Sequence, residues 1–560
     1  MNAKTPVFSG KVATHFLNGE LHYETPAGRL PVRNPATGEV IGFLPDSVSA
    51  GLIGPASERA AEAQEYWHWE VQEQEKELVF RAIIKKFEEH MGPLARTMTL
   101  ESGKLWKWAI AEVQEAVDTL WHYHGEISRA YTHDGFTRCQ MPDKNAFSLR
   151  IPYGKILKLF PWNFPLAVPM WAVCGALAGG NSILLKPAEQ TPFTMQYASL
   201  LIHEALKETF SPERYSRLKG LLQIVQGPGE TSGKLITEEF DYDKVTFTGS
   251  GAVGFRIAAT AASRVKNGRR YGRPCHLELG GHAAMVVLDD FDIDLAVAEA
   301  ITANLGDSGQ RCVSTRVVFV QKSCYKEFLA KYLERARARR IGHPMDFKTE
   351  MGPIVSREQL DRIHEMVMKT TEELGRDPIL GGFGLHRHNL RLIKEDKLNV
   401  DEEAVSRGGY YYAPTVFTDV PYGVTAMDDE IFGPAVVINP LEGETREQAF
   451  WNAVELVNKS DAGLSNALLT NDRRLSSRAP GRFRTGILYI GRGTTGAELN
   501  KYFAAIKASG WGIEGKGLDH WTQIQQVYDD FHGKARMAQA GSDNLAKKMF
   551  GESASPLEEE

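Results

Sequence analysis

Cysteine is scarce in this chain of 560 residues, and its spacing excludes two common uses of thiol groups. A disulfide framework needs an even number of cysteines at regular spacings, and cysteine-based zinc sites usually contain C-x-x-C pairs. The chain has an odd number and no such pair; its five cysteines are Cys139, Cys174, Cys275, Cys312 and Cys324. We therefore expect free thiols in a reducing compartment and no metal centre.

The chain also lacks an excess of positive charge. Its 65 lysine and arginine residues against 71 aspartate and glutamate residues give a formal net charge of -6. Proteins whose main partner is nucleic acid or an anionic membrane usually carry a basic surface. Neither partner is expected here.

Long apolar segments are missing as well. No apolar run approaches the roughly 18 residues that a membrane-spanning helix needs, and residues 1–6 contain no signal-peptide core. With 42% hydrophobic and 24% charged residues, the chain is nevertheless long enough to bury a large core in two or more domains. These features predict a soluble, cytoplasmic, globular protein.

The hydrophobic pattern predicts a helical block followed by alternating strands and helices. Residues 18–45 indicate a small hairpin element, and 57–131 carry apolar residues at helical spacing. Strands are then expected at 153–160, 182–187, 221–225 and 244–248, with helices at 167–178, 194–206 and 230–236. This alternation is typical of a parallel, doubly wound α/β sheet, which binds nucleotides at the carboxyl ends of its strands.

A second α/β run begins near residue 283, with expected strands at 285–288 and 317–320 and a basic helix at 325–340. We interpret the charged face of that helix as solvated surface. Residues 381–409 are polar and indicate a loop. Two further strands, expected at 146–151 and 522–528, lie outside both α/β runs. The charged segment 532–560 is expected to be a disordered tail.

Cys312 stands in a loop, Gly309-Gln310-Arg311-Cys312, shortly before an apolar strand. A thiol presented on a turn can reach a substrate, whereas most cysteines are packed as small hydrophobic residues. Upstream, Glu278 precedes two glycines, and Asn163 stands between two prolines. A thiol, a carboxylate and an amide supply the nucleophile, the base and the oxyanion donor that acyl chemistry on an aldehyde requires.

The segment Gly249-Ser250-Gly251-Ala252-Val253-Gly254 follows the strand at 244–248 and begins a helix, as a G-x-G-x-x-G phosphate loop does. The acidic residue that usually follows about 20 positions later has no good candidate, because Glu278, the nearest one, is already a candidate for the base. Lys186 and Glu189, at the end of the strand at 182–187, are better placed to bind the adenosine ribose. The Ser250 hydroxyl and the amides at the helix start would then bind the pyrophosphate.

Several motifs together strongly resemble the aldehyde dehydrogenase superfamily, over residues 12–531. They are Pro161-Trp162-Asn163-Phe164-Pro165, Lys186-Pro187-Ala188-Glu189-Gln190-Thr191-Pro192, Phe247-Thr248-Gly249-Ser250, Glu278-Leu279-Gly280-Gly281, Gly309-Gln310-Arg311-Cys312 and Glu430-Ile431-Phe432-Gly433-Pro434. The resemblance implies an α/β fold with a Rossmann-type NAD(P)-binding domain (1–130 and 152–280) and an α/β catalytic domain (281–495). It also implies a small β oligomerisation element (131–151 and 496–531).

The resemblance also assigns roles to residues. Cys312 would attack the aldehyde, Asn163 and the Cys312 amide would stabilise the oxyanion, and Glu278 would activate the hydrolytic water. Glu430 and Phe432 would position the nicotinamide ribose and ring. The other cofactor-binding candidates are Phe160, Trp162, Lys186, Glu189, Gly229, Phe247, Gly249, Ser250, Val253 and Leu279.

Two departures leave the substrate open. His282 stands where the family often has lysine, and Tyr502-Phe503-Ala504-Ala505 replaces the usual Pro-Phe-Gly-Gly near the substrate mouth. The length of 250–277 is similar to the glutamate-semialdehyde branch. The loops at 309–312 and 495–498 are similar instead to the aminoadipate-semialdehyde branch.

We expect NAD(P)+-dependent oxidation of an aldehyde, which a semialdehyde would also satisfy, to the carboxylic acid through a cysteine thiohemiacetal and thioester. Glu189 favours NAD, and Lys186 leaves NADP open. One alternative is a CoA-acylating dehydrogenase, against which Glu278 argues. The other is a catalytically silent NAD-binding or structural homologue. Exposed strand edges predict a homodimer or homotetramer.

Overall fold

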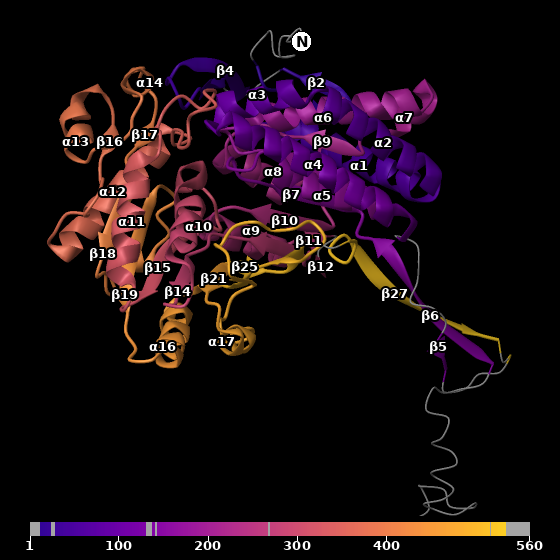
Figure 1. The fold of residues 1–560 in the computed structure, drawn as a ribbon. Helices are drawn as coiled ribbons and strands as arrows, with labels where there is room; N and C mark the ends of the chain where they lie inside the picture. The colour runs from indigo at the N-terminus through magenta and orange to yellow at the C-terminus, as the bar shows by residue number, and fades with distance from the viewer. Residues whose placement is uncertain are drawn as a thin grey trace, which may run out of the picture.

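The computed structural model describes residues 12–23, 28–129, 137–139, 143–266, 269–515, 517–531 and 533. These form two large α/β units and a projecting β arm (Figure 1). The predicted disorder of 532–560 lies outside the described residues, apart from Gly533. In the described part of the chain, no helix is both long and apolar enough to cross a membrane.

The first unit is an eight-stranded sheet with the strand order β2-β1-β9-β8-β7-β10-β13-β25. Its strands are β1 (His15–Leu17), β2 (Glu20–His22), β7 (Lys155–Leu159), β8 (Ser182–Lys186), β9 (Leu222–Ile224), β10 (Lys244–Thr248), β13 (Cys275–Glu278) and β25 (Gly510–Trp511). The five strands from β9 to β13 are parallel. The predicted doubly wound α/β sheet is therefore confirmed.

Helices cover both faces of this sheet. They are α1 (Ala50–Trp69), α2 (Glu73–Glu89), α3 (Met91–Ser102), α4 (Trp106–Glu126), α5 (Ala167–Ala178), α6 (Pro192–Thr209), α7 (Pro212–Leu218), α8 (Lys234–Glu239) and α9 (Gly251–Ser263), with short turns η1 (Ile127–Arg129) and η2 (Gly229–Gly233). Alternate strand residues face opposite cores: Ile156 packs with α2, α4, α5 and α6, whereas Leu157 packs with α8 and α9. Strand β8 is buried along its whole length, which explains its continuous apolar run.

The second unit is a six-stranded parallel sheet with the order β18-β19-β15-β14-β21-β22. Its strands are β14 (Ala283–Val287), β15 (Thr315–Gln321), β18 (Thr415–Thr418), β19 (Ala435–Leu441), β21 (Ser465–Leu469) and β22 (Ile487–Ile490). Its helices are α10 (Ile293–Leu305), α11 (Tyr325–Ala338), α12 (Arg357–Leu374), α15 (Thr425–Asp428), α16 (Arg446–Lys459) and α17 (Arg473–Arg478). Helices α10 and α11 pack on one face and α12 and α16 on the other.

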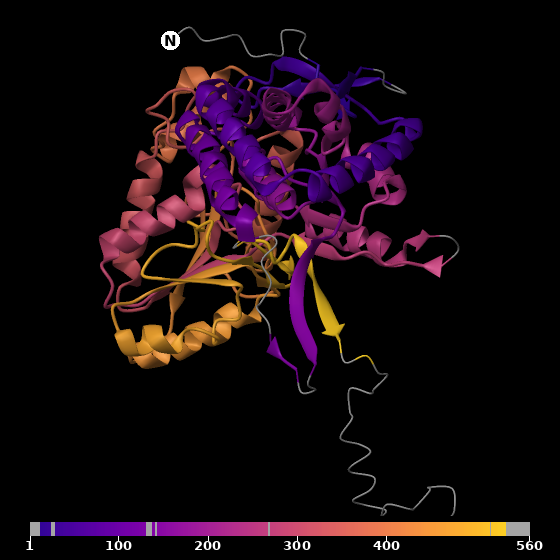
Figure 2. The ribbon, with the colours of Figure 1, turned by 90° about the vertical axis from the view of Figure 1, so that its right-hand side faces the viewer.

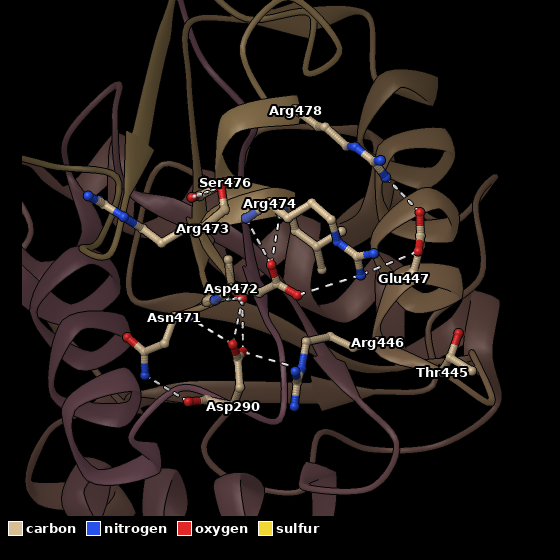
Figure 3. A network of polar contacts seen from close by, with 12 residues as sticks. Asp290, Thr445, Arg446, Glu447, Asn471, Asp472, Arg473, Arg474, Ser476 and Arg478 are labelled. Carbon is tan, nitrogen blue, oxygen red and sulfur yellow. Dashed lines mark hydrogen bonds and ion pairs between the residues drawn. The ribbon is translucent and has the colours of Figure 1, made fainter.

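Polar contacts attach α17 to its neighbours (Figure 3). The Asp472 carboxylate caps the helix by accepting hydrogen bonds from two backbone amides of its first turn. Arg478 donates to Glu447 of α16 over 2.6 Å, and Asp290 accepts from Thr470. Exposed pairs of this kind contribute about 0–1 kcal/mol each, so they orient α17 more than they stabilise the fold.

The segment 381–409 is not simply a loop, in contrast to our expectation. It contains η4 (Arg387–Asn389), α13 (Leu390–Glu395), α14 (Glu402–Ser406) and strand β16 (Gly384–Leu385), which pairs with β17 (Tyr411–Tyr412). Buried Leu385, Ile393 and Val405 anchor these pieces to the core. Elements this short show no complete hydrophobic period, so their pattern resembles that of a polar loop.

An antiparallel ribbon forms the projecting arm (Figures 1 and 2). Strand β27 (Thr522–Asp530) pairs with β6 (Lys144–Pro152) along nine residues, and β5 (Thr137–Arg138) extends the ribbon. Both expected strands, at 146–151 and 522–528, are confirmed. The expected hairpin near the N-terminus consists of β3 (Arg29–Arg33) and β4 (Val40–Pro45).

The remaining elements are short: β11 (Val265–Lys266), β12 (Arg269–Arg270), β20 (Ala462–Gly463), β23 (Phe503–Ala504), β24 (Ile506–Lys507), β26 (Ile513–Glu514) and η3 (Gly306–Gly309). Strand β24 pairs with β20, and β25 joins the edge of the first sheet beside β13. The C-terminal segment therefore contacts both units.

Candidate active site

The loop that carries Cys312 connects α10 to β15. Asp307 and Ser308 have φ angles of 54° and 55°, a left-handed conformation that residues other than glycine seldom adopt. The Gln310 side chain fixes the loop by accepting a hydrogen bond from the Val355 amide and donating to the Asp307 carbonyl. Such local strain persists only where surrounding contacts over-determine it, as is common at functional sites. The loop thus holds Cys312 between the two units.

The Asn163 side chain is bound to this same loop. Asn163 lies between β7 and α5, is buried, and donates from Nδ2 to the Gln310 carbonyl over 2.8 Å. The Asn163 backbone carbonyl accepts a hydrogen bond of 2.6 Å from the Lys104 ammonium group. The backbone of Asn163 and one end of its side-chain amide are therefore fixed, and the side chain is attached to the loop two residues before Cys312.

Glu278 is the last residue of β13, in the first sheet, and its side chain is only 3% exposed. Neither carboxylate oxygen has a hydrogen-bond partner among the described residues. Burial, and then the negative charge of Glu514, raise the pKa of this carboxyl well above its usual value, and Lys158 opposes the shift. A buried carboxyl with a raised pKa is the form of base that accepts a proton near neutral pH.

The two glycines after Glu278 allow three segments to meet. A Cβ atom on Gly280 would collide with the Glu430 carboxylate, and one on Gly281 would collide with the Cys312 carbonyl. The Gly281 amide also lies 3.4 Å from Glu430 Oε1 and donates to it. Side chains at these positions would separate Glu278, Cys312 and Glu430.

Burial raises the pKa of the Cys312 thiol to about 12, and the charges of Glu430 and Glu278 add to the shift. Arg316 and the Cys312 amide act in the opposite direction. The contacts of Gly280 with the Glu430 carboxylate and of Gly281 with the Cys312 carbonyl place these segments next to one another. A thiol with a raised pKa needs a base beside it to become a nucleophile.

Glu430 and Phe432 lie on the second unit, and Phe432 packs against Trp162 of the first. The Phe432 and Trp162 rings meet at right angles, with centroids 5.5 Å apart. Arg316 lies 3.6 Å from Glu430 Oε1, and burial nevertheless raises the pKa of Glu430 to about 7. Sequence reasoning missed Arg316, which no motif marks.

The other cofactor-binding candidates gather at the carboxyl ends of β8, β9 and β10. Lys186 is buried at the end of β8, and Gly229 begins the turn after β9. Burial lowers the pKa of Lys186 to about 8, while Glu189 acts in the opposite direction. Ser250 precedes α9 and makes no capping hydrogen bond with a described residue. The amino end of a helix beside a free hydroxyl suits a phosphate.

Four candidates face the protein core rather than this edge. Phe160, Phe247 and Leu279 are buried in the hydrophobic clusters, and Val253 packs against one of them. Gly249 donates its amide hydrogen to the Glu278 carbonyl over 3.0 Å, which places the phosphate loop beside β13. These residues therefore support the carboxyl-terminal edge of the first sheet by packing in the core below it.

The two departures from the family pattern have a structural setting. Burial lowers the pKa of His282 to about 4, so that its ring is neutral there. Phe503, in β23, packs edge to face against Trp171, with centroids 5.6 Å apart. Trp171 lies on α5, the helix that follows Asn163 in the chain, so the altered segment packs against that helix.

Comparisons with known proteins show the family and the fold. Residues 23–527 match the model of the aldehyde dehydrogenase family. A betaine aldehyde dehydrogenase of Cereibacter sphaeroides is 30% identical over 520 residues, which cover 92% of this chain and 97% of that protein.

Solved structures give the same result. The betaine aldehyde dehydrogenase of Staphylococcus aureus in complex with NAD+ has a TM-score of 0.82 and 25% identity, covering 93% of this chain and 96% of that one. A 3,6-anhydro-L-galactose dehydrogenase in complex with NADP has a TM-score of 0.81 and 26% identity, covering 92% and 100%. The chain therefore belongs to the aldehyde dehydrogenase family, whose NAD(P)-dependent oxidation of aldehydes through a catalytic cysteine it shares.

Proposed function

We propose that Cys312 is the nucleophile, Asn163 the oxyanion donor and Glu278 the base. The observation that carries this assignment is the junction of their three segments. The Asn163 amide donates to the Cys312 loop, and Gly281, three residues after Glu278, packs on the Cys312 carbonyl. These contacts support the proposal that three residues from distant parts of the chain act at one place.

The chemistry of these groups gives the order of events. The Cys312 thiol releases its proton to solvent, the thiolate forms a bond to the aldehyde carbon, and the Asn163 side-chain amide donates to the oxygen that becomes negative. NAD(P)+ supplies the hydride acceptor when bound, which leaves a thioester on Cys312. Glu278 takes a proton from water, the resulting hydroxide adds to the thioester carbon, and the carbon–sulfur bond breaks to release the acid.

The residues at the carboxyl ends of β8 to β10 fit a dinucleotide. The amino end of α9 and the Ser250 hydroxyl suit the pyrophosphate, and Lys186 and Glu189 suit the adenosine ribose. Glu430, Phe432 and Trp162 would hold the nicotinamide end beside Cys312. The Glu189 carboxylate favours NAD because it would repel a 2′-phosphate, and Lys186 keeps NADP open.

Domain roles follow from this assignment. Residues 1–130 and 152–280 would form the cofactor-binding domain, 281–495 the catalytic domain, and 131–151 with 496–531 the oligomerisation element. The arm of β6 and β27 exposes Ile524 and Tyr528, with 58% and 64% of their surface open. An extended ribbon with such residues suits sheet formation with a second copy, so the protein would be a homodimer or homotetramer. Its free cysteines support a cytoplasmic location.

The substrate class is open to direct test. Because a relative at 30% identity is a betaine aldehyde dehydrogenase, aldehydes with an ammonium group should be tested as substrates first, and semialdehydes second. The purified protein should reduce NAD+ with at least one of these aldehydes. A Cys312→Ser variant should be inactive, and Cys275→Ser, which changes another partly exposed cysteine, should match the parent. An active Cys312→Ser enzyme would contradict the assignment.

A further inference from the structure

Two histidines and a glutamate meet beneath Glu278. His276 lies on β13 two residues before Glu278, Glu514 is on β26, and His520 precedes β27. One ligand atom from each of the three lies within 4.8 Å of the others, and all three side chains are buried. Cysteine spacing gave no sign of this group, because its members are not cysteines and His276 lies far from the other two in the sequence.

Two atoms of this group are left without partners. His276 Nε2 and His520 Nε2 are buried, and neither has a hydrogen-bond partner among the described residues. The two rings lie edge to face, with centroids 4.3 Å apart. A buried polar atom without a partner costs about 1–3 kcal/mol, so two side by side need an explanation. One ion that accepts a lone pair from each nitrogen satisfies both.

The opposite ring nitrogens have neighbours that could orient them. His276 Nδ1 lies 3.3 Å from the Thr246 hydroxyl, and His520 Nδ1 lies 3.5 Å from Lys244 Nζ. Metal-binding histidines usually donate the N–H of the second nitrogen to an acceptor, which leaves a lone pair on the first nitrogen for the metal. The Thr246 hydroxyl can accept from His276, and Lys244, whose pKa burial lowers to about 7, can accept from His520 in its neutral amine form.

Nearby charges select the kind of ion. Glu514 already accepts a hydrogen bond of 2.9 Å from Lys158, so any ion must compete with an ammonium group for that carboxylate. Lys244 adds a second positive group, although burial lowers its pKa to about 7. Magnesium and calcium prefer oxygen ligands, and this group offers them a single carboxylate, so they should bind weakly. Zinc and the other late first-row divalent ions bind imidazole strongly, and two histidines with a glutamate form a common zinc donor set.

We propose that His276, His520 and Glu514 form an inhibitory site for a divalent ion of the zinc class. His276 Nε2 is only 3.2 Å from Glu278 Oε1, and the two atoms are not aligned as a hydrogen bond. An ion on that nitrogen therefore lies beside the Glu278 carboxylate and holds it, so that Glu278 no longer accepts a proton from water. This inhibition rests on the proposed role of Glu278, whereas the binding site itself does not.

Binding is tested on the full-length protein after dialysis against a chelator. Co²⁺ should bind at one ion per chain, with the visible absorption of nitrogen and oxygen ligation and without a sulfur-to-metal charge-transfer band. His520→Asn and His276→Asn should each abolish this spectrum. His388→Asn changes a second histidine pair, at the surface with ring centroids 5.6 Å apart, and should leave it intact.

Thermal unfolding of each variant shows whether it is folded. The test needs only one of the two variants, His276→Asn or His520→Asn, to be folded. Zn²⁺ should also raise the unfolding temperature of the parent and not that of His520→Asn. Absent stoichiometric binding in the parent, unchanged binding in a folded ligand variant, or a sulfur charge-transfer band would overturn the site.

Kinetics test the inhibition separately. With Zn²⁺ present, the first turnover should still release its burst of reduced nicotinamide, while steady-state turnover falls. Loss of an outer-shell partner alone costs about 10–100-fold in metal affinity, so His520→Asn should raise the inhibitory Zn²⁺ concentration by at least 100-fold. Loss of the burst would place Zn²⁺ on Cys312 and overturn the proposal. Binding at the three ligands without slower steady-state turnover would instead contradict the role of Glu278.

Discussion

Replacement of Glu278 by glutamine should separate the two halves of the reaction. The side chain is 3% exposed and makes no hydrogen bond with a described residue, so glutamine of nearly equal shape fits without breaking a hydrogen bond. Its amide cannot accept the proton of the hydrolytic water. Loss of a general base usually costs about 10²–10⁴-fold, which corresponds to about 3–5 kcal/mol of barrier. Glu430 cannot replace it freely, because it is bound to the Gly281 amide and Arg316.

The assay is a rapid-mixing measurement of nicotinamide reduction at several enzyme concentrations. The variant should release about one equivalent of reduced cofactor per active site at a rate near that of the parent and then turn over slowly. Glu101→Gln is a matched control, since that carboxyl is also buried and burial raises its pKa to about 8, but it binds the start of α6. Steady-state turnover of Glu278→Gln at the parent rate would refute the reasoning. So would an equal loss of steady-state turnover in Glu278→Gln and Glu101→Gln.

Three further predictions concern the cofactor, pH and assembly. Glu189→Gln should weaken NAD binding and relax discrimination against NADP, and an unchanged ratio of kcat/KM for the two cofactors would contradict the ribose assignment. Because the pKa of Cys312 is raised to about 12 and that of Glu278 well above its usual value, the reactive ionised form of each increases as pH rises. The value of kcat/KM, which depends on the Cys312 thiolate, should therefore increase between about pH 6 and pH 9, and so should kcat, which depends on hydrolysis by Glu278. A decrease of kcat/KM over that range would count against Cys312, and a decrease of kcat would count against Glu278. Sedimentation should show a dimer or tetramer at micromolar concentration. Ile524→Glu should weaken the association of the subunits, and a stable monomer of the parent protein would overturn the role of the arm.

The sequence predicts much of the fold because parallel strands and buried helices leave strong signals. Helix α5 begins and ends where its apolar run does, and ten of its residues are buried. Strand β10 coincides with its expected range for the same reason. The sequence does not predict the short helices of 381–409, because a few buried residues without a full hydrophobic period do not distinguish a helix from a loop.

The site shows a similar division. Cys312, Glu278 and Asn163 were marked by their motifs, and the structure brings their segments together. Lys158 and Glu514, which shift the pKa of Glu278 in opposite directions, were not marked. Glu514 stands in a strand of two residues far downstream, and only the folded chain places it near Glu278. Electrostatic neighbours of this kind depend on tertiary contacts rather than on spacing.

The most direct test of the account is the position of the covalent intermediate. Glu278→Gln should be mixed with NAD+ and an aldehyde substrate, quenched after the burst, digested and analysed by mass spectrometry. The acyl mass should be found on the peptide that contains Cys312, in an amount that matches the burst. An adduct on the peptide of Cys139, Cys174, Cys275 or Cys324, or a full burst without any adduct on Cys312, would contradict the central claim.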